Sequence, residues 1–154
     1  MSSENLIHRS EYLRKIFDKY VDKEWTVLEV GSGDNRNVDY LNQHGYNVIG
    51  IDKLHGTSIQ DFPEKEFDVI FTMSTLFLIP PEEEWVFEKI ARMARKYIIT
   101  VEGETSSPRP RDSLYGRDYT YIFEPFGFKE VEKEFNVFNQ YGVSRVLKND
   151  KKEN

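Results

Sequence analysis

Cysteine is absent from the 154 residues of this chain. Disulfide bonds, thiolate nucleophiles and cysteine-based metal sites are therefore excluded, and we expect no bound metal. Long apolar runs are missing too, since no stretch approaches the roughly 20 residues that a membrane-spanning helix needs. The first residues contain no apolar signal-peptide core. We therefore expect a protein that does not enter a membrane and a cytoplasmic location, which the lack of disulfides fits.

Positive charge is scarce as well. The 27 acidic residues outnumber the 21 lysines and arginines, and the formal net charge is −6. This sign argues against a general nucleic-acid-binding surface and leaves room only for a small local basic patch. We expect a single domain over 1–154, in which an N-terminal helix spans 4–24, a core spans 25–148 and a polar tail spans 149–154.

The most informative stretch is residues 25–52, WTVLEVGSGDNRNVDYLNQHGYNVIGID. Its residues 26–30 are mostly apolar and rich in β-branched side chains, which is typical of a buried parallel strand. The glycine turn 31–33 follows at once and leads into a helical segment. A second strand over 46–51 then ends at Asp52. The stretch thus predicts a strand, a tight turn, a helix and a second strand that ends in an acid.

This order of elements suits a nucleotide-type ligand. Gly31 and Gly33 permit a tight turn and let a ligand lie against bare backbone. The N-terminus of the following helix offers free N–H groups to a polar or anionic group. Asp52, about 20 residues further on, is placed to accept hydrogen bonds from two ribose hydroxyls. The alternative is that the glycines only turn the chain and Asp52 only caps a loop. Against it, the strand, the glycines, the helix, the second strand and the acid all follow in the expected order and spacing.

Four segments resemble the class I S-adenosylmethionine-dependent methyltransferases. LEVGSGDN at 28–35 is similar to their first motif, an acid one residue before a G-x-G turn. VIGID at 48–52 is similar to the segment that carries their second-strand acid. FDVIFTMSTLFLIP at 67–80 resembles their fourth strand with the loop after it, and GFKEV at 127–131 resembles the opening of their sixth strand. The resemblance covers roughly residues 25–135.

The resemblance implies an α/β fold of the Rossmann-like class. Such a fold has a doubly wound, mostly parallel sheet with a C-terminal antiparallel hairpin, in a three-layer sandwich. It also implies a methyltransferase that uses S-adenosyl-L-methionine as its cofactor. The residues that the resemblance assigns to the cofactor are Glu29, Gly31, Ser32, Gly33, Asp34, Asn35, Asp52, Lys53, Ile59, Gln60, Met73 and Ser74.

Within this set the resemblance implies separate roles. Asp52 would hold the ribose, and Ile59 and Gln60 would wall the adenine. Glu29 and Asp34 would favour the positively charged end of the cofactor.

Two features depart from the family pattern. Asn35 stands where many members carry a third glycine. The stretch 53–66 is too short for a third strand together with its crossover helix, because a parallel step takes a dozen or more residues. We therefore predict that the helix after the second strand is lost or reduced to a turn. Residues 57–61 would form a short edge strand or an extended loop, and the pocket would be open on its adenine side.

Periodicity predicts the remaining elements. An amphipathic helix over 4–24 is indicated by the spacing of Leu13, Ile16, Phe17, Tyr20 and Val21. Strands are predicted over 67–72, 97–101, 131–137 and 143–147, and helices after Pro80 and over 119–126. Pro81 and the three acids after it suit the first turn of a helix, so we interpret that acidic run as structural.

The segment 104–119, ETSSPRPRDSLYGRDY, is the one long irregular stretch, and such loops are either functional or mobile. The resemblance places acceptor-binding elements here. The candidate substrate-binding residues are Arg109, Arg111, Tyr115 and Tyr119, with Arg117 beside them. Their guanidinium groups and rings can bind an anionic or aromatic acceptor. The alternative, equally consistent with the sequence, is a solvated loop whose arginines have no binding role. We expect a small-molecule acceptor, since the chain has little room for a recognition domain, and a protein acceptor stays open.

The sequence identifies no catalytic base. Methyl transfer from a sulfonium needs one only if the acceptor must lose a proton, and in-line positioning alone can contribute about 7–11 kcal/mol. The weak candidates for a base are Asp34, Glu102, Tyr115 and His8.

Two other functions use the same scaffold. An NAD-dependent oxidoreductase would share the turn and the ribose acid, but Arg36 would crowd the helix–strand contact of a pyrophosphate site. A non-catalytic binding module that keeps the fold is the other alternative. The methylated atom and the oligomeric state are not specified by the sequence.

Overall fold

Residues 3–104 and 114–151 are described by the structure, a computed structural model of the chain. Its centre is one six-stranded sheet with the order β2-β1-β3-β4-β6-β5. The strands are β1 (Thr26–Val30), β2 (Asn47–Ile51), β3 (Phe67–Met73), β4 (Ala94–Gly103), β5 (Phe128–Phe135) and β6 (Gly142–Asn149). The α-helices are α1 (Ser3–Tyr20), α2 (Arg36–Gln43), α3 (Trp85–Met93) and α4 (Tyr119–Phe123).

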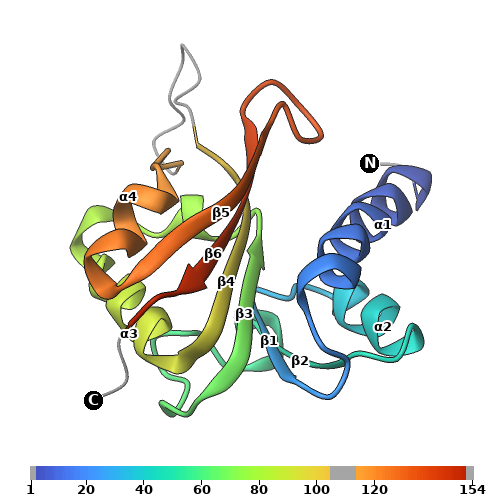
Figure 1. The fold of residues 1–154 in the computed structure, drawn as a ribbon, viewed down its shortest axis with the longest axis horizontal. Helices are drawn as coiled ribbons and strands as arrows, with labels where there is room; N and C mark the ends of the chain where they lie inside the picture. The colour runs from blue at the N-terminus through green and yellow to red at the C-terminus, as the bar shows by residue number, and fades with distance from the viewer. Residues whose placement is uncertain (1–2, 105–113, 152–154) are drawn as a thin grey trace.

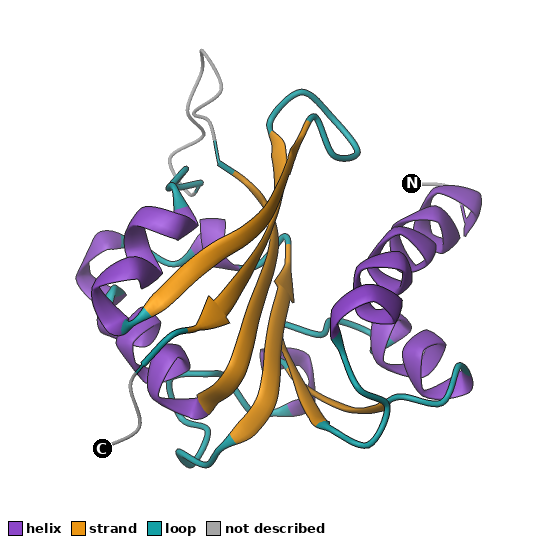
Figure 2. Cartoon of the chain, in the orientation of Figure 1, coloured by secondary structure: helices purple, strands orange, loops and turns teal. Residues whose placement is uncertain are grey.

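The sheet is mostly parallel. Strands β1 to β4 run in one direction, whereas β6 runs antiparallel to both of its neighbours, β4 and β5. Helices α1 and α2 cover one face of the sheet, and α3 and α4 cover the other (Figure 1). Figure 2 shows the resulting order of helix, sheet and helix. The predicted Rossmann-like fold with a C-terminal antiparallel hairpin is thereby confirmed.

Each face of the sheet has its own apolar core. Successive side chains of a strand point to opposite faces, so Val27 of β1 joins the core under α1 and α2, and Leu28 joins the core under α3 and α4. The Phe17 ring of α1 packs edge-on against Phe71 of β3, with the ring centroids 5.2 Å apart. Burial on both faces explains why β1 and β3 are mostly apolar in sequence and do not alternate between apolar and polar residues.

The carboxyl ends of the parallel strands meet at one edge of the sheet. Strand β1 lies between β2 and β3. The helix after β1 covers one face, whereas the helix after β3 covers the other. A reversal of this kind opens a crevice beyond the strand ends. The residues that follow β1, β2 and β3 therefore converge there.

The connection from β2 to β3 is reduced, as the sequence predicts. A 3-10 turn over Lys53–His55 stands where a crossover helix would be. Residues 57–61 form a loop and not an edge strand, and in it the Asp61 and Phe62 amides donate to the Ser58 carbonyl oxygen at 3.1 and 2.9 Å. Strand β2 is consequently the outer strand at this side of the sheet.

Several elements differ in extent from their predicted ranges. The N-terminal helix, predicted over 4–24, ends at Tyr20. Strand β4 begins at Ala94 and not at residue 97, because α3 ends at Met93 and the chain enters the sheet directly. Strand β5 begins at Phe128 and not at residue 131, because Gly127 adopts a φ of 95° and ends the preceding turn. The helix predicted after Pro80 starts as a 3-10 turn over Pro81–Glu83 before α3.

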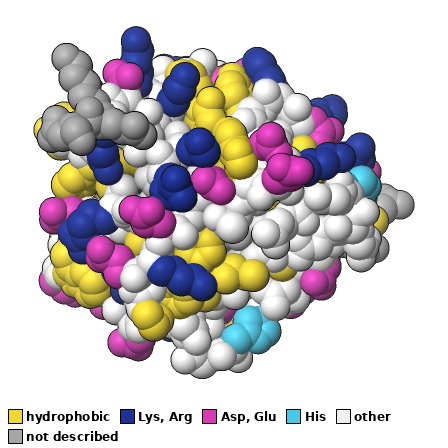
Figure 3. Space-filling view, turned by 60° about the horizontal axis from the view of Figure 1, so that its bottom comes forward, with side chains coloured by type: hydrophobic (Ala, Val, Ile, Leu, Met, Phe, Trp, Pro, Cys, Tyr) yellow, Lys and Arg dark blue, Asp and Glu magenta, His cyan; other side chains and the backbone are white. Residues whose placement is uncertain are grey.

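The surface has no region of one sign on the face drawn in Figure 3, where acidic and basic side chains are interspersed with apolar patches. That face offers no extended basic area for a phosphate backbone. None of the helices in the described part of the chain is both long and apolar enough to cross a bilayer.

Candidate functional site

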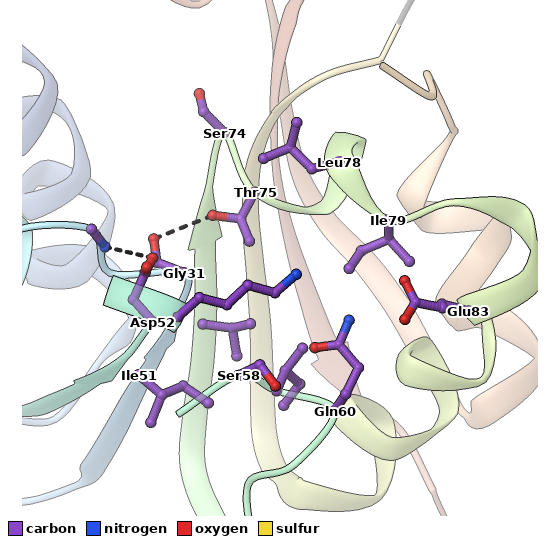
Figure 4. Close-up of a pocket in the computed structure, with 14 residues that line it drawn as sticks. Gly31, Ile51, Asp52, Ser58, Gln60, Ser74, Thr75, Leu78, Ile79 and Glu83 are labelled. Atoms are coloured by element: carbon purple, nitrogen blue, oxygen red, sulfur yellow. Dashed lines mark hydrogen bonds between the residues drawn. The ribbon is translucent and has the colours of Figure 1, made fainter. Parts of the chain in front are cut away.

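Two loops are tied together where β1 and β2 end. The Gly31 and Ser32 amides donate hydrogen bonds to the Ile51 carbonyl oxygen at 2.9 and 3.0 Å. The Gly33 amide donates to Oδ2 of Asp52 at 2.9 Å. The glycine turn and the predicted ribose acid therefore lie side by side, as Figure 4 shows for Gly31 and Asp52.

The two glycines of the turn serve different purposes. Gly31 has a φ of +78°, and a Cβ atom there would lie 2.2 Å from Oγ1 of Thr75. The Thr75 hydroxyl lies 3.3 Å from the Gly31 carbonyl oxygen, to which it donates a hydrogen bond. Gly33 has a φ of +56°, and apart from Gly33 and its two chain neighbours no heavy atom of the described residues lies within 4 Å of its ideal Cβ position. Gly31 thus permits close contact with the loop after β3, whereas Gly33 leaves bare backbone facing open space.

A cavity of about 360 Å³ lies on one side of this turn (Figure 4). Its volume falls within the range of about 300–1,000 Å³ that is usual for small-ligand sites. The carboxylate of Asp52 and the amide of Gln60 are among its polar groups. Its lining residues are Val30, Gly31, Gly33, Ile51, Asp52, Lys53, Ser58, Ile59, Gln60, Ser74, Thr75, Leu78, Ile79 and Glu83.

A second cavity of about 190 Å³ adjoins the first. Both cavities are lined by Gly31, Gly33 and Ser74, so they meet at the glycine turn. The residues that line only the smaller cavity are Arg9, Glu29, Ser32, Asp34, Arg36, Asn37 and Met73. Two carboxylates and two guanidinium groups therefore face one small space, which suits a ligand group that carries both signs of charge.

Glu29 is the most perturbed acid of the smaller cavity. Its residue is 2% exposed, and burial raises the pKa of its carboxyl to about 8. The Asn37 amide donates to Oε2 at 3.3 Å. Oε1 of Glu29 and Nε of Arg36 are buried and have no hydrogen-bond partner among the described residues. Buried polar atoms are normally paired, so these two atoms lack the partners that such groups usually have.

Glu102, at the end of β4, is buried and supports the loop after β3. Its two carboxylate oxygens accept hydrogen bonds from the Thr75 amide at 2.9 and 3.0 Å. Burial raises the pKa of this carboxyl to about 7. The loop needs this support because Ser74 adopts a left-handed φ of 54°. Glu102 therefore positions the loop that lines both cavities.

The structure brings the predicted cofactor residues together. All of them except Asn35 line one of the two cavities. Asn35 has a left-handed φ of 66°, and its Oδ1 lies 2.7 Å from the ideal Cβ position of Gly50. Asparagine tolerates a left-handed backbone better than most residues, so it can replace the third glycine of the family pattern. Asn35 thus has its place in the turn and lines neither cavity.

The predicted acceptor-binding residues that the structure describes, unlike the cofactor residues, are not brought together at the cavities. Arg109 and Arg111 lie outside the described residues. Tyr119 is fully buried, packs against Phe87 and Phe123, and lines neither of the two cavities. Its position on the inner side of α4 places the ring in the apolar core.

The guanidinium group of Arg117 forms hydrogen bonds within the protein. Its guanidinium donates to Oε2 of Glu84 at 2.9 Å and to the carbonyl oxygens of Leu76 and Ile79 at 3.2 and 2.6 Å. It therefore closes the turn that carries Leu78 and Ile79. The Tyr115 amide donates to the Phe77 carbonyl oxygen at 2.7 Å in the same region.

The candidate bases do not form a catalytic group. The His8 side chain is 72% exposed and lies 3.7 Å from Glu11 on the surface of α1. Asp34 lies at the rim of the smaller cavity with 76% of its side chain exposed.

Several lining residues were not predicted from the sequence. Thr75, Leu78, Ile79 and Glu83 follow β3, and their approach to the glycine turn depends on how the sheet twists. Arg9 gives no local signal, because it lies on a helix far from the turn in sequence. Arg36 was noted only as an obstacle to a pyrophosphate.

The raised pKa values predict that folding stability falls with rising pH. Both Glu29 and Glu102 bind a proton more tightly in the folded protein than in the unfolded chain. Their stabilising contribution is complete below the ordinary glutamate pKa and is lost as the pH rises through about 7 to 8. Each group gives a slope of up to about 1.4 kcal/mol per pH unit.

We expect Glu29→Gln to flatten this dependence when the free energy of unfolding is measured by urea denaturation between pH 5 and pH 8.5. Glu66→Gln is the control, because that side chain is 67% exposed. An equal slope in the wild type and in Glu29→Gln would contradict the assignment.

Comparison with known proteins gives matches in structure only. No family model matches the sequence, and no curated protein matches it. A Burkholderia thailandensis 1,6-didemethyltoxoflavin-N1-methyltransferase, solved with 1,6-didemethyltoxoflavin and S-adenosylhomocysteine, superposes with a TM-score of 0.73. It is 13% identical, and the match covers 96% of this chain and 79% of that one.

Two further solved structures are similar. The magnesium protoporphyrin IX methyltransferase of Synechocystis with bound S-adenosylhomocysteine gives a TM-score of 0.68 at 14% identity, covering 94% of this chain and 81% of that one. A SAM-dependent methyltransferase from Methanosarcina mazei gives 0.70 at 13% identity, covering 86% and 96%. At such identities the likeness concerns the fold. This chain has the fold of the class I S-adenosylmethionine-dependent methyltransferases.

Proposed function

We propose that this protein binds S-adenosyl-L-methionine and transfers its methyl group to a small-molecule acceptor. The observation that carries the proposal is the position of the Gly31–Gly33 turn between two adjoining cavities, with Asp52 on one side and paired opposite charges on the other. Structural neighbours solved with S-adenosylhomocysteine support this choice of cofactor.

The larger cavity fits the adenosine part of the cofactor. Asp52 accepts one backbone hydrogen bond at each oxygen, from Gly33 and from Leu54, both at 2.9 Å. A carboxylate oxygen has two lone pairs, so each oxygen of Asp52 can accept one ribose hydroxyl as well. The aliphatic side chains of Ile59 and Ile79 offer apolar surfaces for a flat base.

The smaller cavity fits the amino acid part. An ammonium group would meet the unpartnered Oε1 of Glu29, and a carboxylate would meet the unpartnered Nε of Arg36 together with Arg9. A bound cation favours the ionised form of Glu29, which burial disfavours in the free protein. Binding near neutral pH should therefore release a proton.

The chemistry requires alignment more than acid–base catalysis. When bound, S-adenosylmethionine would supply a methyl carbon activated by the positive sulfonium, and sulfur would keep the electron pair of the carbon–sulfur bond on transfer. The residues of both cavities hold the donor in place, and in-line positioning can contribute about 7–11 kcal/mol. The neighbours named for toxoflavin and porphyrin chemistry act on small molecules, which supports an acceptor of that class here.

A thermal-shift series tests the proposal against its alternatives. We expect stabilisation by S-adenosylmethionine and by S-adenosylhomocysteine, and none by NAD. A ligand present at 100 times its Kd should stabilise the folded state by about 2.7 kcal/mol. Stabilisation by NAD alone would indicate an oxidoreductase, and no shift with any ligand would indicate a binding module without this cofactor.

The same series includes the variant Asp52→Ala. We expect it to abolish the shift with S-adenosylhomocysteine, because the ribose loses its acceptor and the Gly33 amide loses its partner. Asp39→Ala is the matched control, since this exposed acid lies on α2 outside both cavities. A shift that survives in Asp52→Ala would rule out the ribose assignment.

The two ends of the ligand can be tested separately by calorimetry. We expect Arg9→Met to weaken S-adenosylhomocysteine binding by about 10-fold, a loss of about 1.4 kcal/mol, while adenosine binding stays unchanged. Adenosine lacks the amino acid that the smaller cavity would hold. Arg14→Met on the same helix is the control, because Arg14 lines neither cavity. Equal weakening of both ligands in Arg9→Met would contradict the placement of the carboxylate.

A further inference from the structure

The wall of the larger cavity at residues 58–62 is held by a buried lysine. Lys89, on α3, is 7% exposed. Its Nζ atom donates to the carbonyl oxygens of Ile59 at 2.7 Å, Gln60 at 3.4 Å and Phe62 at 2.5 Å. An ammonium group has three N–H donors, so these carbonyl oxygens use all of them.

The Lys89 side chain is unusual because it is a buried positive charge without an ion-pair partner in the described part of the chain. Burying an ammonium group is costly unless it is paired and hydrogen-bonded. Within the described residues Lys89 forms no ion pair with a carboxylate. Its charge is compensated mainly by the dipoles of main-chain carbonyl groups that converge on one atom, with a further Coulombic interaction with Glu64. The geometry therefore indicates a specific function for this side chain in fixing the loop.

The lysine takes the place of a missing strand. In a sheet, the carbonyl oxygens of residues 58–62 would accept hydrogen bonds from a neighbouring strand, and buried acceptors need such partners. Here the segment is a loop, and Lys89 supplies the donors from α3. A second contact from the same helix lies further along, where the guanidinium of Arg92 binds Glu64 at 2.9 Å. Helix α3 thus contacts the connection between β2 and β3 at two points, within residues 58–62 and at Glu64.

The fixed segment is the part of the cavity that would face the base. The Ile59 side chain is 5% exposed and belongs to the core, yet it also lines the cavity together with Gln60. Lys89 binds the carbonyl oxygens of these two residues. A shift of this ammonium group would therefore move both of them relative to Asp52.

We propose that Lys89 is a positioning residue that sets the adenine-side wall and so gives the site its selectivity for the base of the cofactor. The inference rests on the proposed function, because it assigns the larger cavity to adenosine. Lys89 does not line that cavity itself and acts through the main chain of Ile59 and Gln60.

The test compares two ligands that differ only at the base. S-adenosylhomocysteine carries a 6-amino group, and S-inosylhomocysteine carries an oxygen there. Their dissociation constants are measured by calorimetry for the wild type, Lys89→Met and Lys148→Met. The last variant is the control, because Lys148 is exposed on β6 and distant from the cavity in the sheet order.

We expect the wild type and Lys148→Met to prefer the adenine ligand by at least 10-fold. Lys89→Met should bind S-adenosylhomocysteine at least 10-fold more weakly, and its preference should fall towards one. A purely structural lysine would lower the melting temperature and leave the ratio unchanged. If Lys89→Met does not fold, Lys89→Gln keeps an amide donor near the carbonyl oxygens and should show an intermediate ratio.

Each contrary result has its own meaning. A wild type that binds neither ligand overturns the proposed function and this inference with it. A wild type that binds both ligands equally, or a Lys89 variant that keeps the wild-type ratio, overturns the inference and leaves the proposed cofactor in place.

Discussion

The hydrogen bond from the Gly33 amide to the Asp52 carboxylate is the contact on which the site depends. It joins the turn after β1 to the end of β2, and two further amides of that turn bind the Ile51 carbonyl oxygen. The positions of Gly31 and Gly33 are thereby fixed relative to the carboxylate. Because both cavities are lined by these glycines, the bond also determines where two parts of one ligand would lie.

The reduced connection between β2 and β3 changes how this edge of the sheet is stabilised. A strand would satisfy its main-chain groups in the sheet, but the loop at 58–62 depends on the ammonium group of Lys89. Glu102 has a comparable role on the opposite side, where it binds the Thr75 amide. Two buried ionisable residues outside the glycine turn thus hold the loops that complete the larger cavity.

The sequence predicted those parts of the site that are local in the chain. The strand, turn and helix after residue 25 follow from apolar periodicity and from two glycines, and Asp52 follows at the end of the next strand. Arg9 and Lys89 could not be found in this way, because their approach depends on how distant helices pack on the sheet. Tyr119 was predicted as an acceptor contact because it lies in the 104–119 stretch where the resemblance places acceptor-binding elements, and that stretch gives no signal that its ring belongs to the apolar core.

A crystal structure of the protein with S-adenosylhomocysteine tests the central claim most directly. The account predicts that both ribose hydroxyls lie within about 3.2 Å of the Asp52 carboxylate oxygens. The amino acid end should lie in the smaller cavity between Glu29 and Arg36. A ligand bound in the reverse direction, or outside the crevice between the glycine turn and Asp52, would contradict it.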